Sequence, residues 1–190
     1  IIPAYSKQVY RHMDIGSAKI RPEEMCGVPH YLIDVLDPSE EFHVVKFVEL
    51  AHEAMEKIYA AGQIPIVTGG TGFYIQALLK EVDFTESHGE LPIRKQLEEK
   101  AATEEGAAEL YRELSEVDPA SAETIHPNNV KRVSRALEYY HETGQKISEH
   151  NEEQKQKESP YCSAYFVLND ERSILYDRID RRVDQMICDG

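Results

Sequence analysis

Several residue classes are scarce in this sequence, and each scarcity narrows what the protein can be. Cysteine occurs only three times, as Cys26, Cys162 and Cys188, and no Cys-x-x-Cys pair is present. An even disulfide framework is therefore absent, zinc binding has no support, and free thiols in a reducing cytoplasm are the simpler interpretation. No apolar run approaches the roughly 20 residues that span a bilayer, and no secretory signal is recognisable. We expect a cytoplasmic protein without a membrane segment.

Basic residues are also in short supply. The chain of 190 residues carries 21 Lys and Arg against 35 Asp and Glu, which gives a formal net charge of −14. Such a balance argues against indiscriminate binding of nucleic acid, because phosphate contacts need Lys and Arg. An acidic protein can still hold RNA with a local basic patch, so the position of the charges decides. The composition is otherwise that of a globular chain, long enough for one domain or one domain with an inserted lobe.

The apolar pattern predicts a parallel α/β sheet. Short apolar runs typical of strands occur at residues 1–4, 31–36 and 64–68. Residues 44–61 fit a helix that ends at Gly62, and residues 73–79 fit a second helix. Alternation of strand, loop and helix favours parallel strands, and the sites of such sheets lie at the carboxyl ends of the strands. Residues 5–8 and 69–72 both fall at that edge.

The composition changes near Asp83. Residues 92–102, 107–116, 119–125 and 129–143 are helix candidates, and no convincing strand lies among them. Residues 149–159 are polar and predicted as a mobile loop, residues 163–168 as a returning strand, and residues 171–188 as a helix with Ile179, Val183 and Met186 on its apolar side. We therefore expect an α/β core at residues 1–84 and 160–190, with a helical insertion at residues 85–159.

A glycine-rich loop is the most suggestive chemical feature. Gly69, Gly70, Thr71 and Gly72 follow a predicted buried strand and precede a helix. Such a loop lets backbone N–H groups approach an anion closely, and the threonine hydroxyl can add one hydrogen bond. A plain tight turn between strand and helix is the structural alternative, and the residues alone leave both open.

Two basic groups could contact phosphate. Lys131 and Arg135 are four residues apart at the start of a predicted helix, and Arg132 flanks them. This group suits an RNA backbone, although a solvated helix face is the simpler alternative. Near the end of the chain Arg178, Arg181 and Arg182 lie beside Asp177 and Asp180, with which they could simply pair. The histidines have no Ser or Cys at catalytic spacing, so hydrolase chemistry is not supported.

Several segments, in the same order along the chain, resemble one family. Residues 6–19 contain Ser6, Gln8 and the run VYRHMDIGSAK, and they resemble the family stretch DSxQVYxxMDIGTAK. Residues 28–34 (VPHYLID) are similar to VPHHLID, and residues 66–74 (IVTGGTGFY) to LVGGTGLY. Residues 126–138 (HPNNVKRVSRALE) are similar to HPNDxxRxxRALE, and residues 178–186 (RIDRRVDQM) to RIxxRxxxM. The family is that of the tRNA dimethylallyltransferases.

The resemblance implies a P-loop-like parallel sheet with an inserted helical lobe, and a reaction. A dimethylallyl group moves from its diphosphate to the adenosine just 3′ of the anticodon, which is swung out of the RNA. Thr71 and Arg182 are the implied catalytic residues, with Mg²⁺ as cofactor and no metal ligand implied in this chain. The implied diphosphate ligands are Gly69, Gly70, Thr71, Gly72 and Arg182. The implied contacts with the tRNA anticodon stem-loop are Tyr5, Ser6, Lys7, Gln8, Thr71, Arg94, Lys131, Arg132, Val133, Ser134 and Arg135.

The sequence departs from the family pattern in two ways. The phosphate-binding loop GPTAxGKT that opens the family pattern, and the segment that follows the last motif in the family, are not in this chain, so we expect an incomplete α/β core. We also expect a monomer. Tyr5 stands where the family has its catalytic Asp, and Pro3 and Lys7 also differ from the usual Ser and Met. A phenol stays protonated at neutral pH and is a poor general base. We therefore expect impaired transfer, with a non-catalytic tRNA-binding protein as the alternative. A small-molecule kinase of the P-loop class is disfavoured by the HPNN and RALE motifs.

Overall fold

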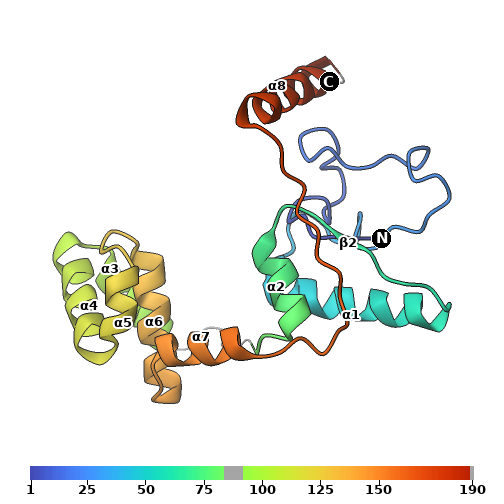
Figure 1. Cartoon of the computed structure of the whole chain (residues 1–190). Coiled ribbons are helices and arrows are strands. Elements are labelled where there is room, and N and C mark those ends of the chain that lie inside the picture. The colour runs from blue at the N-terminus through green and yellow to red at the C-terminus, as the bar shows by residue number, and fades with distance from the viewer. Residues whose placement is uncertain (84–91, 189–190) are drawn as a thin grey trace. The chain divides into compact units, whose positions relative to one another are not determined.

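The computed structural model describes residues 1–83 and 92–188. Within it the chain forms two compact units, of which one comprises Ile1–Val82 with Ser159–Gly190 and the other Asp83–Glu158. The first unit contains the strands and the glycine loop, whereas the described part of the second unit is helical. Figure 1 shows the helices α3, α4, α5 and α6 of the second unit grouped together.

The sheet of the first unit is small and parallel. Strand β1 (Ile2–Pro3) pairs with strand β2 (Val67–Thr68), with Ile2 opposite Val67. The backbone N–H of Ala4 continues the ladder by donating to the carbonyl oxygen of Thr68 at 2.7 Å. The predicted parallel pairing of these two segments is therefore confirmed, although both strands are shorter than the apolar runs that contain them.

Two other predicted strands are wrong. Residues 31–36 contribute only an isolated parallel bridge between Tyr10 and Leu36, and residues 163–168 form no strand. A strand is stable only when a neighbour satisfies its backbone hydrogen bonds and covers its side chains. Phe166 and Leu168 are 83% and 97% exposed, so their segment has no such neighbour among the described residues.

Two helices cover the sheet of the first unit. Helix α1 (Val44–Ala60) begins where the His43 side chain accepts a hydrogen bond from the Lys46 amide, and it ends before Gly62, which has a φ of 69°. Helix α2 (Gly72–Lys80) packs against α1, with Phe47 and Tyr74 stacked at 4.9 Å between ring centroids (Figure 1). Because these rings and Ile2 share one core, the two helices fix the strand ends that carry the glycine loop.

The second unit is a helical bundle. It contains α3 (Pro92–Ala101), α4 (Glu104–Val117), α5 (Pro119–Thr124), α6 (Val130–Thr143) and α7 (Ile147–Gln156). Leu110, Leu114, Val133 and Leu137 form the centre of its core and are at most 1% exposed. Four of these helices lie close to the predicted ranges, because their apolar residues recur at helical spacing.

Helix α7 corrects the prediction of a loop at residues 149–159. Asp118 explains why a polar segment is helical here. Its buried carboxylate caps the start of α5 by accepting hydrogen bonds from the amide and hydroxyl of Ser121, at 3.2 and 2.6 Å. The same carboxylate accepts from the amide and hydroxyl of Ser148, at 3.0 and 2.6 Å. One side chain thus anchors the first turns of two helices.

Helix α8 (Arg172–Cys188) forms as predicted, but its predicted packing is wrong. No residue of α8 is buried, and Ile179 and Val183 are 55% and 46% exposed. The apolar side of an amphipathic helix is buried only where a partner surface meets it. Residues 163–168 were expected to bring this helix to the sheet as a strand. Because they form none, the apolar side of α8 has no cover among the described residues.

Candidate functional site

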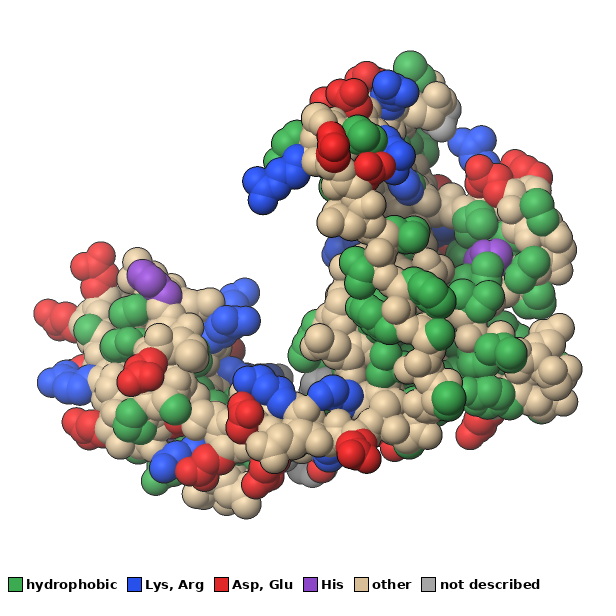
Figure 2. Space-filling view, viewed as in Figure 1, with side chains coloured by type: hydrophobic (Ala, Val, Ile, Leu, Met, Phe, Trp, Pro, Cys, Tyr) green, Lys and Arg blue, Asp and Glu red, His purple; other side chains and the backbone are tan. Residues whose placement is uncertain are grey.

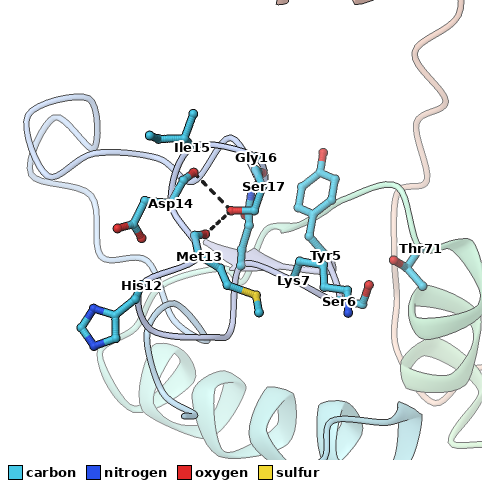
Figure 3. Close-up of a pocket in the computed structure, with 11 residues that line it drawn as sticks. Tyr5, Ser6, Lys7, His12, Met13, Asp14, Ile15, Gly16, Ser17 and Thr71 are labelled. Atoms are coloured by element: carbon cyan, nitrogen blue, oxygen red, sulfur yellow. Dashed lines mark hydrogen bonds between the residues drawn. The ribbon is translucent and has the colours of Figure 1, made fainter. Parts of the chain in front are cut away.

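A cavity of about 600 Å³ opens at the carboxyl ends of β1 and β2. Residues 5–8, 12–17 and Thr71 line it, so the N-terminal segments and the distant glycine loop meet there. Figure 3 shows Tyr5 and Thr71 on one side of this cavity and residues 12–17 on the other. Its position agrees with the edge at which ligands bind in parallel α/β sheets.

The glycine loop reaches the cavity because it crosses the end of β1 at close range. The Thr71 amide donates a hydrogen bond to the Ala4 carbonyl oxygen at 3.2 Å. A Cβ atom on Gly69 would lie 2.4 Å from that same oxygen, so position 69 accepts no side chain without a shift of the backbone. Gly70 faces the Tyr5 ring, where an added Cβ would be 3.5 Å from the nearest ring atom. These contacts place Tyr5 next to Thr71.

Thr71 has the geometry of an anion contact. It is the N-cap residue of α2, yet its side chain makes no capping hydrogen bond with that helix. The hydroxyl therefore remains available on the cavity side, at the helix end where backbone dipoles favour negative charge. A glycine loop followed by a helix start is a common arrangement for phosphate binding.

The opposite wall is a loop that Gln8 holds in place. The Gln8 side-chain amide donates to the carbonyl oxygens of Ser17 and Ala18, at 3.1 and 3.2 Å. Gln8 is 8% exposed, so most of its side chain serves this contact. Ala18 has a φ of 47°, a backbone conformation that is uncommon for alanine and that the loop's contacts maintain. Gln8 was expected to contact RNA, and in this structure its amide group positions the cavity wall.

Lys19 stabilises the same loop through buried hydrogen bonds. Its ammonium group donates to Asp14 and to Asp34, both at 2.6 Å, and to the Tyr10 carbonyl oxygen at 2.8 Å. The Lys19 side chain is only 5% exposed. Burial alone would lower its pKa, but the two aspartates outweigh that effect and raise the pKa of Lys19 above its ordinary value. The lysine therefore stays charged and joins the MDIGSAK and VPHYLID segments.

The charges of the cavity suit binding better than proton removal. Asp14 is the only carboxylate among its described lining residues, and it forms an ion pair with Lys19, which it shares with Asp34. Tyr5, at the position where a carboxylate is expected, is 42% exposed and presents a phenol. The cavity can thus receive an anion at Thr71 and a flat group beside Tyr5, but position 5 itself offers only a phenol, which is a poor general base.

A second cavity, of about 430 Å³, lies on the helical unit between α3 and α6. Arg94, Lys131, Ser134 and Arg135 are among the residues that line it. Figure 2 shows basic side chains gathered along one edge of this unit and acidic ones over much of the opposite edge. Lys131 and Arg132 are exposed, and Arg135 is partly exposed.

Val133, one of the predicted RNA contacts, has its side chain in the core of the helical unit. It is 1% exposed, because it lies on the side of α6 away from the exposed Lys131. Its side chain cannot reach RNA without disrupting that core. The remaining residues of the predicted RNA surface stay predictions.

Arg182 is not among the residues that line the cavity beside Thr71. It is exposed on α8, and the described residues do not bring it together with Thr71. Its assignment therefore stays a prediction. The roles of Lys19 and of residues 13–17 were not predicted from the sequence, although these residues lie inside the motif MDIGSAK.

Two features are absent from the described residues, 1–83 and 92–188. No helix there is long and apolar enough to cross a membrane. No group of three or more His, Cys, Asp or Glu side chains there is placed to hold a metal ion.

Comparison with known proteins identifies close relatives. A family described as IPP transferase matches residues 8–190. A tRNA dimethylallyltransferase of Lachnoclostridium phytofermentans is 60% identical over all 190 residues, and one of Geobacillus thermodenitrificans is 48% identical. The chain spans about 60% of the length of each of these relatives.

Solved structures agree. A full-length tRNA isopentenylpyrophosphate transferase of Bacillus halodurans is 43% identical, with a TM-score of 0.62 over all of this chain and 57% of its own. A eukaryotic dimethylallyltransferase acting on tRNA is 37% identical, with a TM-score of 0.84 over all of this chain and 46% of its own. These likenesses confirm the predicted fold class, a P-loop-like parallel α/β sheet present in part. The chain belongs to the IPP transferase family.

Proposed function

We propose that this protein serves the transfer of a dimethylallyl group from dimethylallyl diphosphate to the exocyclic nitrogen of the adenosine 3′ of the anticodon in tRNA. In this reaction the bond between the allylic carbon and the diphosphate oxygen breaks, and a carbon–nitrogen bond forms. The adenosine nitrogen loses one proton, and diphosphate leaves. The observation that supports this proposal best is the joint placement of Thr71 and Tyr5 in one cavity of a family member.

The glycine loop and Thr71 would bind the diphosphate. Gly69, Gly70 and Gly72 allow the backbone close to the anion, and the start of α2 favours its negative charge. The Thr71 hydroxyl would donate to a phosphate oxygen whose charge increases as the allylic carbon departs. Arg182 would add a cation from α8, as the family resemblance implies.

The flipped-out adenosine of the tRNA would be the part that enters the cavity. Residues 5–8 would border the extruded base, with the Tyr5 ring offering a stacking surface. The tRNA backbone would lie on the surface that contains Arg94, Lys131, Arg132, Ser134 and Arg135. In a chain with a net charge of −14, this local cluster is needed for any phosphate contact.

Magnesium does not fit the described residues as a protein-held ion. Mg²⁺ prefers carboxylate and phosphate oxygens in an octahedral arrangement. Asp14, the one carboxylate of the cavity, is occupied by Lys19. A magnesium ion would therefore depend on the oxygens of the diphosphate itself.

Tyr5 favours a second candidate function, RNA binding without efficient transfer. The amine of the adenosine needs a base to take its proton, and the cavity offers a phenol at that place. We propose that transfer is slow with Tyr5 and that the protein acts as a monomer in the cytoplasm. RNA binding would persist, because the basic cluster lies on the other unit.

The test is the incorporation of a labelled dimethylallyl group into unmodified tRNA. Thr71→Val replaces the hydroxyl by a methyl group of similar size and should reduce incorporation at least tenfold, the loss of one charged hydrogen bond. Thr68→Val is the matched control, since Thr68 lies at the end of β2 outside the cavity lining. Equal incorporation by wild type and Thr71→Val would contradict the assigned diphosphate site.

A further inference from the structure

Glu138 is an acid buried among basic side chains. Its side chain is 4% exposed on α6, within the HPNN…RALE segment. Arg94 of α3 donates from Nε to Glu138 Oε1 at 3.0 Å and from Nη2 to Oε2 at 3.3 Å. Arg135 of α6 donates from Nη1 to Oε2 at 2.9 Å. One carboxylate therefore holds two guanidinium groups that come from different helices.

These contacts orient the arginines more than they stabilise the fold. The side chains of Arg94 and Arg135 are 44% and 39% exposed, so solvent screens their attraction to Glu138. An exposed arginine on its own samples many rotamers and holds no fixed plane. The two-pronged contact of Arg94 fixes the plane of its guanidinium group, because both donors must meet one carboxylate.

The oriented groups line the second cavity. Arg94, Lys131 and Arg135 contribute three positive charges to its lining, against the carboxylates of Glu98 and Glu138. The lining is therefore net positive in an acidic chain. A guanidinium group has five N–H donors, and Glu138 takes two of those of Arg94. The other donors of Arg94 can meet a phosphate, whose geometry matches the guanidinium fork.

We propose that Glu138 is a positioning residue for RNA: its carboxylate holds Arg94 and Arg135 in the orientation in which they bind a backbone phosphate. This inference rests on the proposed binding of tRNA and deepens it. In this account the negative charge of Glu138 favours the binding of RNA, although RNA is itself a polyanion. In the competing account Glu138 only fills the helical core, and its charge merely repels RNA. The two accounts predict opposite changes in RNA affinity when the charge of Glu138 is removed.

Glu138→Gln separates these accounts because it removes the charge and keeps the shape. If the charge of Glu138 merely repels RNA, the variant binds more tightly, as for any lost acid on an RNA surface. If Glu138 positions the arginines, binding weakens by about tenfold, the loss of one charge-assisted contact. Glu142→Gln is the matched control, an exposed acid four residues further along α6. It should bind equally or slightly more tightly.

The probe is an anticodon stem-loop RNA with an unmodified adenosine 3′ of its anticodon, followed by fluorescence anisotropy at several salt concentrations. In a background of Arg94→Gln with Arg135→Gln, Glu138→Gln should weaken binding no further. The Nε–H signal of Arg94 in ¹⁵N NMR should report an ordered side chain in the wild type and a mobile one in Glu138→Gln. Arg94→Lys keeps the positive charge but loses the two parallel N–H donors of the guanidinium group, and it should weaken RNA binding as much as Glu138→Gln does. It replaces Glu138→Gln as the test if Glu138→Gln fails to fold.

The outcomes distinguish this inference from the proposed function. If the wild type binds the RNA and Glu138→Gln binds it as tightly or more tightly, the positioning role is overturned and tRNA binding stands. Unchanged binding by Arg94→Lys overturns it in the same way. If the wild type shows no salt-dependent binding at all, the proposed RNA surface fails, and the role of Glu138 fails with it.

Discussion

The Thr71 amide donates to the Ala4 carbonyl oxygen at 3.2 Å, which ties the start of α2 to the end of β1. Through this hydrogen bond the glycine loop and residues 5–8 become neighbours, although more than sixty positions separate them in the sequence. The proposed binding sites for dimethylallyl diphosphate and for the tRNA adenosine thus both depend on this one backbone hydrogen bond. Substitutions near it should affect both.

Gly69→Ala should disrupt this contact. The new Cβ would lie 2.4 Å from the Ala4 oxygen, so the backbone must move, at about 1–3 kcal/mol of folding stability. Gly70→Ala is the control, because its Cβ would meet the Tyr5 ring at an ordinary 3.5 Å. Urea unfolding of both variants measures the difference. Equal stability of the two would show that the close approach at Gly69 is not maintained in solution.

Part of this arrangement could be predicted from the sequence. Residues 44–61 were expected to form a helix because Phe47, Ala51 and Ile58 recur at helical spacing, and α1 covers Val44–Ala60. The glycine loop was expected at the sheet edge because an apolar run precedes it. Both predictions depend on the spacing of residues within a short segment, which can be read from a single sequence.

The failures concern contacts between distant residues. Residues 163–168 have the composition of a strand, but no strand lies beside them in the described residues, and composition cannot supply a neighbour. Helix α7 was missed because its anchor, Asp118, lies thirty positions away from Ser148. From the sequence alone Glu138 looks like an ordinary acid on a charged helix, because its partner Arg94 lies on a different helix, α3.

Lys19→Met should loosen the cavity wall and reduce stability by about 1–2 kcal/mol, a value limited by the exposure of both aspartates. The pH dependence has a definite sign. Because the folded state raises the pKa of Lys19 above 10.5, its contribution is full below pH 10.5 and is lost as pH rises through the folded pKa.

Urea unfolding near pH 8 and near pH 11 measures this dependence, and the wild type should lose more stability between them than Lys19→Met. Lys46→Met is the control, since the Lys46–Glu49 pair is 42% and 52% exposed. If Lys46→Met destabilises as much as Lys19→Met, the buried network has no special role.

Asp118→Ala should destabilise the helical unit by about 2 kcal/mol or more, since it removes a helix cap and leaves Ser121 and Ser148 without their acceptor. Burial alone would raise the pKa of Asp118, but the hydrogen bonds from Ser121 and Ser148 outweigh it and lower the pKa below 3.8. Its contribution is therefore present above pH 3.8 and is lost as pH falls through the folded pKa.

Thermal unfolding of the protein between pH 7 and pH 2 checks this prediction. The gap between wild type and Asp118→Ala should narrow only below about pH 4. Glu116→Ala, which removes an exposed acid in the last turn of α4, two residues before Asp118, should leave the melting temperature nearly unchanged. A gap that stays constant down to pH 2 would mean that the charge of Asp118 is not what anchors α5 and α7.

The most direct test of the proposed transfer site is the rate of modification with and without a carboxylate at position 5. Tyr5→Asp supplies a carboxylate at the position where the family has its catalytic Asp, and general-base catalysis is typically worth about a hundredfold to ten-thousandfold. The measurement is mass spectrometry of nucleosides from tRNA incubated with dimethylallyl diphosphate and either protein. Because the family's phosphate-binding loop is not in this chain, we predict little dimethylallyl-adenosine from Tyr5→Asp alone. A large increase should need both Tyr5→Asp and a family phosphate-binding segment joined ahead of Ile1, and adding Thr71→Val should remove it again. An unchanged rate when both changes are present, or full activity after adding Thr71→Val, would contradict the placement of the reaction in this cavity.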